Sequence, residues 1–323
     1  MTEPTTSTTP TRLTKQHVRV GEATVAYLDE GPAQDSAERT GPPLLLLHGC
    51  PFSSFIWRKV IARLRDRFRC IAPDLLGLGD TETPAGAAWS VPAQAAMVVG
   101  LLDALGLDQV DVVAHDHGAA AAQLVAAGHP QRIRRLVLTN AEAYDNWPSR
   151  DELPFIRAAQ LPGLGRVVLW AWARPSLFRY ALRSGKAVCD PAVLTPELLD
   201  GYIAANFADP HRRAKTRRFL GGQLDPANHR ATADAVPGLR AFDHPTLIVW
   251  GEDDPHFGPD WGRRLLADIP GAQRLDLLPR TGHLLMEERP DELARVVADL
   301  LTDPGSGPGR PAPVHGEGAH GHG

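Results

Sequence analysis

The sequence has little of what marks secreted or membrane-spanning proteins. Its 323 residues include only three cysteines, Cys50, Cys70 and Cys189, which make no paired disulfide framework and favour a reducing, cytoplasmic location. No apolar run approaches the roughly 20 residues of a membrane span. The Thr-rich beginning also lacks the apolar core of a signal peptide. We therefore expect a cytoplasmic protein with no membrane partner.

Long runs of one charge are missing too. Lys and Arg number 34 against 38 Asp and Glu, and the net charge is −4. The arginines at 212–213 and 217–218 fit a solvated helix face better than a nucleic-acid surface. Three histidines lie in the Gly-rich end of the chain, at 315, 320 and 322, and we do not expect them to bind metal. The sequence thus predicts no nucleic-acid partner, no metal and no cofactor.

What is present is an alternation of short apolar runs and segments with helical spacing. Buried strands are expected at 44–47, 68–72, 110–114, 134–139, 246–250 and 273–278, with helices between them. A hairpin is expected over 17–28. From 147 to about 237 only helical segments are recognisable. Such alternation predicts an α/β fold with a mostly parallel sheet and helices on both faces.

The same pattern predicts the domain organisation. Residues 17–145 and 237–302 form the two parts of one α/β core, and residues 146–236 form a helical cap inserted between them. Residues 1–16 and 303–323 are expected to be disordered tails, because they are polar or rich in Gly, Pro and His.

Residues 110–119 combine a strand, a sharp turn and a helix. The apolar run 110–114 leads to Asp116, and an Ala-rich helix is expected from Gly118 onward. Small residues at Ala114 and Gly118 allow a tight turn that exposes the Asp116 side chain above the sheet. This is the geometry of a nucleophile elbow with Asp in place of Ser. The alternative is an Asp that only caps the helix.

Polar residues follow several of the expected strands. Because parallel strands end at one rim of a sheet, these side chains are expected to converge there. They are His48, Asp74, Asp116, Asn140, Asp254 and His283. Asp116, Asp254 and His283 follow the order nucleophile, acid and histidine, which is typical of an α/β-hydrolase.

Other residues compete for these roles. Glu252, Asp253 and Glu142 are rival acids, but the Gly-x-x-Asp spacing favours Asp254. His48 is expected to be a structural loop histidine. Asp80 is expected to bind backbone N–H groups in a turn rather than to act in catalysis.

Residues 17–302 resemble an α/β-hydrolase, and the insertion resembles the cap of that fold. Residues 48–58 (HGCPFSSFIWR) and 72–80 (APDLLGLGD), with the pair Asn140-Ala141, are similar to haloalkane dehalogenases. Epoxide hydrolases share part of the first stretch, but they usually have Arg-Gly-Tyr-Gly where this chain has residues 76–79 (LGLG). Both families have an aspartate nucleophile and use no cofactor.

The chain also departs from these families. Haloalkane dehalogenases have Trp directly after the nucleophile, to hold halide, where this chain has His117; many have Asn where Cys50 stands. Haloacetate dehalogenases have Arg at the same position as His117. Epoxide hydrolases use cap tyrosines to polarise the epoxide, and the predicted cap offers Tyr180 and Tyr202. His117 is a candidate replacement for the missing halide donor.

An Asp nucleophile suits a saturated carbon. A carboxylate that attacks an ester forms an uphill anhydride, whereas attack on a carbon bearing halide or an epoxide oxygen forms a stable alkyl ester. Water then hydrolyses this ester with His283 as general base, and Asp254 holds the His283 tautomer. The backbone N–H groups of Cys50 and His117 are expected to form the oxyanion hole.

The sequence therefore predicts a hydrolase for a small apolar substrate, with haloalkane dehalogenase-like activity. An epoxide hydrolase is the alternative. A non-hydrolytic ligand-binding protein or a cyclase on the same fold are further alternatives, although a binding protein would not need the base His283.

Overall fold

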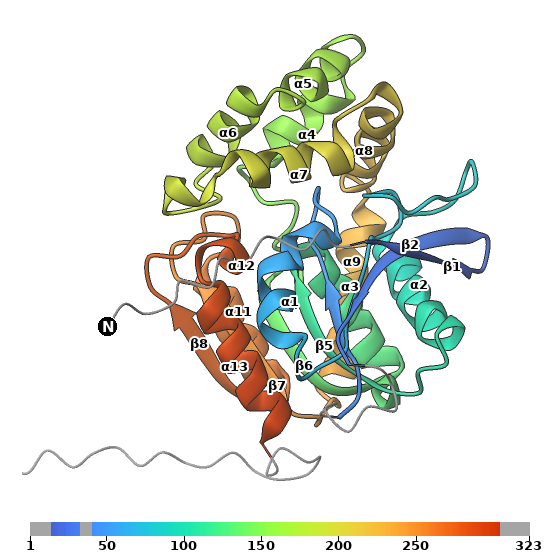
Figure 1. Cartoon of the computed structure of the whole chain (residues 1–323), viewed down its shortest axis with the longest axis vertical. Helices are drawn as coiled ribbons and strands as arrows, with labels where there is room; N and C mark the ends of the chain where they lie inside the picture. Colours follow the sequence, from blue (N-terminus) through green and yellow to red (C-terminus); the bar gives the residue numbers. More distant parts are fainter. Residues whose placement is uncertain (1–13, 33–40, 304–323) are drawn as a thin grey trace, which may run out of the picture.

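The structure is a computed structural model that describes residues 14–32 and 41–303, and its centre is an eight-stranded sheet (Figure 1). The order across the sheet is β1-β2-β4-β3-β5-β6-β7-β8. β1, β2 and β4 pair antiparallel, and the other neighbours are parallel, as the alternation predicts. The strands are β1 (Gln16–Val20), β2 (Ala23–Glu30), β3 (Leu44–Leu47), β4 (Cys70–Pro73), β5 (Val110–His115), β6 (Ile133–Ala141), β7 (Thr246–Gly251) and β8 (Ala272–Leu278).

Helices cover both faces of the sheet because the central strands are apolar on both sides. In β3, Leu44 and Leu46 pack into the cluster on one face, and Leu45 and Leu47 into the cluster on the other. The first face carries α1 (Arg58–Leu64), α12 (Leu285–Glu288) and α13 (Pro290–Thr302). The second carries α2 (Val91–Ala104), α3 (Asp116–Gly128), α10 (Val236–Leu239) and α11 (Pro259–Asp268). Short 3-10 helices are η1 (Ser54–Trp57), η2 (Pro130–Arg132) and η3 (Pro191–Val193).

Between β6 and β7 the chain forms helices and no strand. Five of them, here called the cap helices, lie together beyond one end of the sheet (Figure 1). They are α4 (Leu153–Gln160), α5 (Leu164–Trp172), α6 (Pro175–Ser184), α7 (Pro196–Asn206) and α8 (Pro210–Gly222). The next helix, α9 (Pro226–Asp234), packs against α2 and α3 instead, although the sequence assigns it to the cap.

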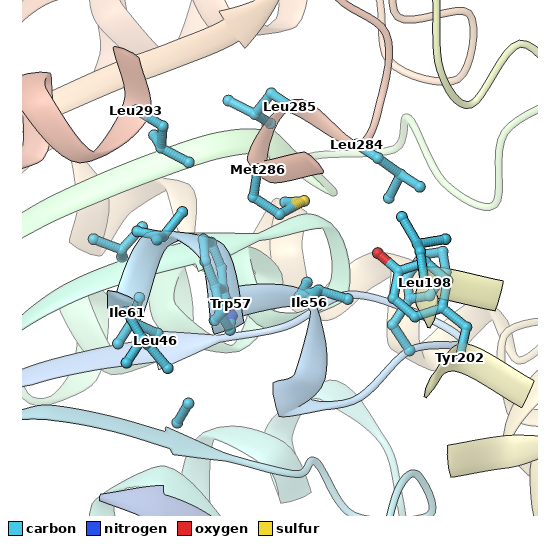
Figure 2. Packing of buried hydrophobic residues seen from close by; sticks show 14 of the residues in the cluster. Leu46, Ile56, Trp57, Ile61, Leu198, Tyr202, Leu284, Leu285, Met286 and Leu293 are labelled. Atoms are coloured by element: carbon cyan, nitrogen blue, oxygen red, sulfur yellow. The ribbon is translucent and has the colours of Figure 1, made fainter. Parts of the chain in front are cut away.

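A continuous apolar cluster joins the cap helices to the core. Figure 2 shows Leu198 and Tyr202 of α7 beside Ile56, with Leu284 on the neighbouring segment. All of these side chains are buried. Burying such side chains contributes about 1.5–3 kcal/mol each, so this packing fixes α7 against the core.

The folded part of the chain begins slightly earlier than the expected end of the N-terminal tail at residue 16. β1 begins at Gln16, and the Lys15 ammonium binds the Asp74 and Asp80 carboxylates at 2.6 and 2.8 Å. The rest of the expected tails, residues 1–13 and 304–323, lie outside the described residues. No helix within 14–32 or 41–303 has the length and apolar character needed to cross a membrane.

Candidate active site

Asp116 lies at the turn between β5 and α3, as the elbow predicts. Its φ of 52° is in the left-handed region, which Asp tolerates better than most residues. Gly49 and Gly118 permit this turn: a Cβ on Gly49 would collide with the Asp116 carboxylate, and one on Gly118 with the His48 carbonyl. The side chain is only 2% exposed, because Gly49, Cys50 and His283 pack against its carboxylate. The prediction of an exposed Asp116 is therefore wrong.

The three residues that the sequence singled out for catalysis meet at this turn. The Nε2 atom of His283 lies 3.4 Å from Oδ2 of Asp116, and its Nδ1 atom lies 2.9 Å from Oδ2 of Asp254. The other Asp116 oxygen, Oδ1, accepts the backbone N–H of Cys50 at 2.6 Å. Of the rival acids, neither Glu142 nor Asp253 bonds to His283, and Asp253 is exposed.

Asp254 is held by a network that the sequence did not reveal. Oδ2 accepts the Asn140 side-chain N–H at 2.6 Å, and Oδ1 accepts the backbone N–H groups of His256 and Phe257 at 2.8 and 3.3 Å. Asn140 in turn accepts the N–H of Gly251 at 2.9 Å, and its φ is 37°. Its position at the end of β6 placed it on the rim, but no sequence pattern indicated that it binds the acid.

The charges of the three groups depend on one another. Burial disfavours a charged imidazole, yet the carboxylates of Asp254 and Asp116 raise the pKa of His283 well above its ordinary value. Burial likewise opposes the charge on Asp116, but the hydrogen bond and positive charge of His283 hold the pKa of Asp116 well below its usual range. In the free protein, His283 is therefore an imidazolium between two carboxylates.

A cavity of about 720 Å³ lies between this rim and the cap helices. Cys50 and His283, which both contact the Asp116 carboxylate, line it from the core side. Its apolar wall comes from the cap side and includes Phe155, Trp172, Leu182 and Leu220. Asp116 itself is not among the residues that line this cavity, so a ligand in it would reach the carboxylate between Cys50 and His283.

A family model described as the alpha/beta hydrolase fold matches residues 42–290. The chain belongs to the alpha/beta hydrolase fold family. It is 31% identical over 282 residues to haloalkane dehalogenase 2 of Mycobacterium tuberculosis, covering 85% of this chain and 90% of that one. It is 28% identical over 291 residues to a cis-3-alkyl-4-alkyloxetan-2-one decarboxylase of Shewanella oneidensis, covering 86% and 85%. The crystal structure of the ancestral haloalkane dehalogenase AncHLD2 matches with a TM-score of 0.73 and 27% identity, covering 88% and 98%.

In this hydrolase, His117 is turned away from the cavity. The ring is buried, lies edge-on to Trp147 and Phe219, and does not line the cavity wall. Its Nδ1 atom lies 2.7 Å from Oε2 of Glu142, and its Nε2 atom has no hydrogen-bond partner among the described residues. The cavity wall holds Glu142 instead, whose side chain keeps 6% exposure.

Burial sets the protonation of this pair. Burial, with the negative charges of Asp116 and Glu152, raises the pKa of Glu142 well above its usual range. Burial lowers the pKa of His117 to about 4, although the negative charge of Asp116 acts to raise it. The raised pKa of Glu142 and the lowered pKa of His117 both favour a neutral pair, in which the Glu142 carboxyl donates to Nδ1 of His117. An unperturbed imidazole would titrate near pH 6.5. Because its pKa is lowered, His117 is not expected to titrate there.

The remaining sequence candidates have structural roles. Nδ1 of His48 bonds to the Gly49 carbonyl and its Nε2 accepts the Leu75 N–H at 2.9 Å, as expected for a loop histidine. The turn at residues 74–80 is held by Asp74, which accepts the N–H of Asp80 at 2.7 Å. The Asp80 carboxylate binds Lys15 and Arg212, so the prediction that it binds backbone N–H groups is wrong.

Neither cap tyrosine faces the cavity. Tyr202 is buried and donates its hydroxyl to Oε1 of Glu287 at 2.8 Å. Tyr180 is 70% exposed on the outside of the cap. Both positions lie away from the Asp116 carboxylate and outside the cavity lining. The pair of tyrosines that polarises an epoxide in epoxide hydrolases has no counterpart in these two residues.

The buried histidines are expected to make the stability of this hydrolase depend on pH. Burial lowers the pKa of His48 to about 4 and that of His115 to about 3, whereas both protonate near pH 6.5 in the unfolded chain. Between about pH 6.5 and 4, the unfolded state therefore binds two more protons. The free energy of unfolding should fall as pH falls, by up to about 2.7 kcal/mol per pH unit. Urea unfolding at pH 7, 6 and 5 measures this slope.

Other groups in the site add little to the slope in this window. The lowered pKa of His117 and the raised pKa of Glu142 leave that pair with the same number of protons folded and unfolded, and His283 is protonated in both states. His115→Leu should halve the slope, because it removes one of the two histidines that gain a proton on unfolding. The change also removes the contact of 3.2 Å between Nδ1 and the Thr139 carbonyl, which lowers stability without a dependence on pH in this window. His129→Leu, at an exposed position, is the matched control. An unchanged slope in His115→Leu would contradict the assignment.

Proposed function

We propose that this hydrolase breaks a bond between a saturated carbon and a leaving group by attack of Asp116, with carbon–halogen bonds as the leading substrate class. One observation carries the proposal: a carboxylate stands where a hydrolase elbow usually presents Ser, beside a histidine that a second carboxylate holds. The similarity to haloalkane dehalogenases supports the halide case. The apolar wall of the cavity supports a small apolar substrate.

The first step assigns different roles to the two Asp116 oxygens. Oδ1 is held by the Cys50 N–H at 2.6 Å, whereas Oδ2 has only the longer contact of 3.4 Å with His283, so we assign the attack to Oδ2. Oδ2 forms a C–O bond to the substrate carbon while the carbon–halogen bond breaks, and halide leaves with the electron pair. The product is an alkyl ester of Asp116, and the carboxylate charge is lost.

Loss of that charge prepares the second step. The Asp116 carboxylate is one of the two groups that raise the pKa of His283, so alkylation lowers this pKa and favours the neutral base. Neutral His283 then takes a proton from water, and the hydroxyl oxygen attacks the Asp116 carbonyl carbon. The oxyanion forms on Oδ1, against the N–H of Cys50 and the expected N–H of His117. Collapse releases the alcohol, whose oxygen takes the proton from His283. The carboxylic acid left at Asp116 then gives its proton to His283, which restores the starting carboxylate and imidazolium, and the proton that His283 lost after alkylation leaves to solvent with the halide.

Glu142 favours a second candidate, hydrolysis of an epoxide. A halide leaves as a stable anion, whereas an epoxide oxygen leaves as an alkoxide that needs a proton. Glu142 lines the cavity, its backbone N–H bonds to the Asp116 carbonyl at 3.3 Å, and burial raises its pKa, which favours the acid form. In this candidate the Glu142 carboxyl turns its proton from Nδ1 of His117 to the epoxide oxygen as Oδ2 of Asp116 opens the ring, and a proton from solvent restores the acid later.

A panel of electrophiles tests the proposal. The intact protein is incubated with 1-bromoalkanes, terminal epoxides and a cis-3,4-dialkyloxetan-2-one of similar chain length, and halide, diol and acid or alkene products are quantified. Release of bromide with formation of alcohol is expected. Absence of turnover on every member, under conditions where the protein is folded, would count against an Asp116 hydrolase of this class.

Glu142→Gln separates the two candidates. The amide keeps the size of the side chain and its contact with His117 but has no acidic proton to give. If Glu142 is the acid, epoxide opening should fall by about 100-fold or more, while bromide release changes by less than about tenfold. Asp151→Asn, also on the cavity wall, is the matched control. Equal effects of the two variants on epoxide opening would remove Glu142 from the reaction.

A further inference from the structure

The outer side of the cap gathers the exposed apolar surface of the molecule. Every large hydrophobic side chain that is strongly exposed within residues 14–32 and 41–303 lies in α5, α6 or the turn before α5, between residues 161 and 180. They are Leu161, Leu164, Val167, Trp170, Leu177 and Tyr180, with exposed fractions from 45% to 70%. A gathered patch of this kind marks an interaction surface, whereas scattered exposed residues need no explanation.

The same surface is strongly basic. Residues 153–189 contain five arginines and one lysine and no Asp or Glu, although the whole chain has a net charge of −4. Within the described chain, none of these six cations forms an ion pair with a carboxylate. Arg174 instead lies over the Trp170 ring, with its guanidinium carbon 4.4 Å from the ring centroid. The positive charges of Arg166, Arg174 and Arg179, which lie in or next to α5 and α6, are therefore not neutralised by an ion pair within the described residues.

A hollow between α5 and α8 extends the basic surface. This groove of about 880 Å³ is lined by Val167 and Trp170 together with arginines, and no acidic side chain contributes to it. Two of the arginines are fixed by backbone carbonyls: Arg213 donates to the Phe207 carbonyl at 2.6 Å and Arg217 to that of Ala159 at 2.8 Å. The groove therefore offers oriented cations beside apolar side chains.

We propose that this face, formed by the outer sides of α5 and α6 and the groove beside them, docks the hydrolase on the surface of an anionic lipid bilayer. Apolar and aromatic side chains with Arg around them are the composition of surface-bound amphipathic helices, which enter the headgroup region without spanning the membrane. Figure 1 shows α5 and α6 in the cap, at the end of the molecule away from most of the sheet. The proposal revises the expectation of no membrane partner, which considered only spanning segments.

Charge argues against a second copy as the occupant. A twofold interface would bring this acid-free face against itself and place Arg opposite Arg. An anionic bilayer supplies the opposite charge and an apolar layer at the same time. The proposal also connects with the cavity: α6 presents Leu177 and Tyr180 outward, while its Ala181 and Leu182 line the cavity. Docking would thus place the cavity-lining helices next to a lipid phase in which apolar substrates concentrate.

Vesicle sedimentation with the full chain tests the proposal. The protein is mixed with vesicles of phosphatidylcholine alone or of phosphatidylcholine with phosphatidylglycerol, at low and at high salt. Binding to the anionic vesicles is expected, with weakening at high salt as the charges are screened. No binding to anionic vesicles at low salt would overturn the proposal, as would equal binding to both compositions.

Two sets of variants locate the surface. The triple variant Arg166→Gln, Arg174→Gln and Arg179→Gln should lower the partition coefficient by about 100-fold, because each basic residue near an anionic surface contributes about a factor of five. Val167→Ser should lower it by about tenfold. The matched control is Arg240→Gln with Arg263→Gln and Arg274→Gln. It removes three exposed arginines from the surface of the α/β domain, outside the cap. Equal loss in the two triple variants would overturn the proposal.

Two further measurements complete the test. Sedimentation equilibrium reports the oligomeric state without lipid; a dimer that the Arg166, Arg174 and Arg179 changes dissociate would identify a second copy as the occupant and overturn the bilayer proposal. Turnover of a water-soluble substrate without vesicles should be unchanged in that variant, because these residues lie outside the catalytic site. Failure of the docking proposal is therefore distinguishable from failure of the proposed function.

Discussion

Asp116→Ala is expected to lower kcat by about 10⁴-fold or more, because Asp116 is the carboxylate that the Cys50 N–H and His283 hold at the turn. The protein should still fold. The change removes the hydrogen bond to the Cys50 N–H and leaves Ala in a left-handed conformation, which together cost about 1–3 kcal/mol of unfolding free energy. Turnover of the best substrate in the panel and urea unfolding measure the two effects.

Asp253→Ala is the matched control for this change. Asp253 is an exposed aspartate next to Asp254. Neither the kcat nor the free energy of unfolding of the Asp253→Ala variant is expected to change much. If Asp116→Ala retained a tenth of the wild-type kcat while folded, Asp116 would not be the nucleophile. The elbow would then be a helix-capping turn, which was the alternative interpretation of residues 110–119.

His283→Gln is expected to separate the two chemical steps. Gln has no basic nitrogen, so the ester hydrolysis should slow by about 10²–10⁴-fold. Formation of the ester needs only the Asp116 carboxylate and should persist. One equivalent of bromide should therefore be released in a rapid phase, and the peptide that contains Asp116 should gain the mass of one alkyl group.

The trapped ester also decides between classes of function. A binding protein would release no bromide and form no adduct, and a cyclase that uses His283 as its base would form no ester. His129→Gln, at an exposed position on the C-cap of α3, is the matched control and should turn over normally. Multiple turnovers of His283→Gln at the wild-type rate would show that another group activates the water.

Local patterns in the sequence predicted the fold and the three residues that we propose for catalysis. Four consecutive leucines at 44–47 indicate a strand buried on both faces, and such strands alternating with helices form a parallel sheet. A parallel sheet sends the carboxyl end of each strand to one rim, so the ends of β5, β7 and β8 had to bring Asp116, Asp254 and His283 near one another. These conclusions needed only chain order and apolar spacing.

Tertiary structure alone decided which way each side chain on the rim faces. Glu142 and His117 lie on neighbouring elements, and the sequence allowed either one to line the site; the packing of Trp147 and Phe219 around His117 turned its ring to Glu142 and left the acid at the cavity. Tyr202 was a plausible cavity residue until α7 docked on the core and paired it with Glu287.

The apolar face of the cap was hidden from the sequence for the same reason. In α6, Phe178 is buried while Leu177 and Tyr180 are exposed, although all three are large and hydrophobic. Hydrophobic spacing identifies a helix, but it does not say which neighbour covers which side. Burial, orientation and charge compensation depend on contacts between residues far apart in the chain, and these contacts exist only once the chain has folded.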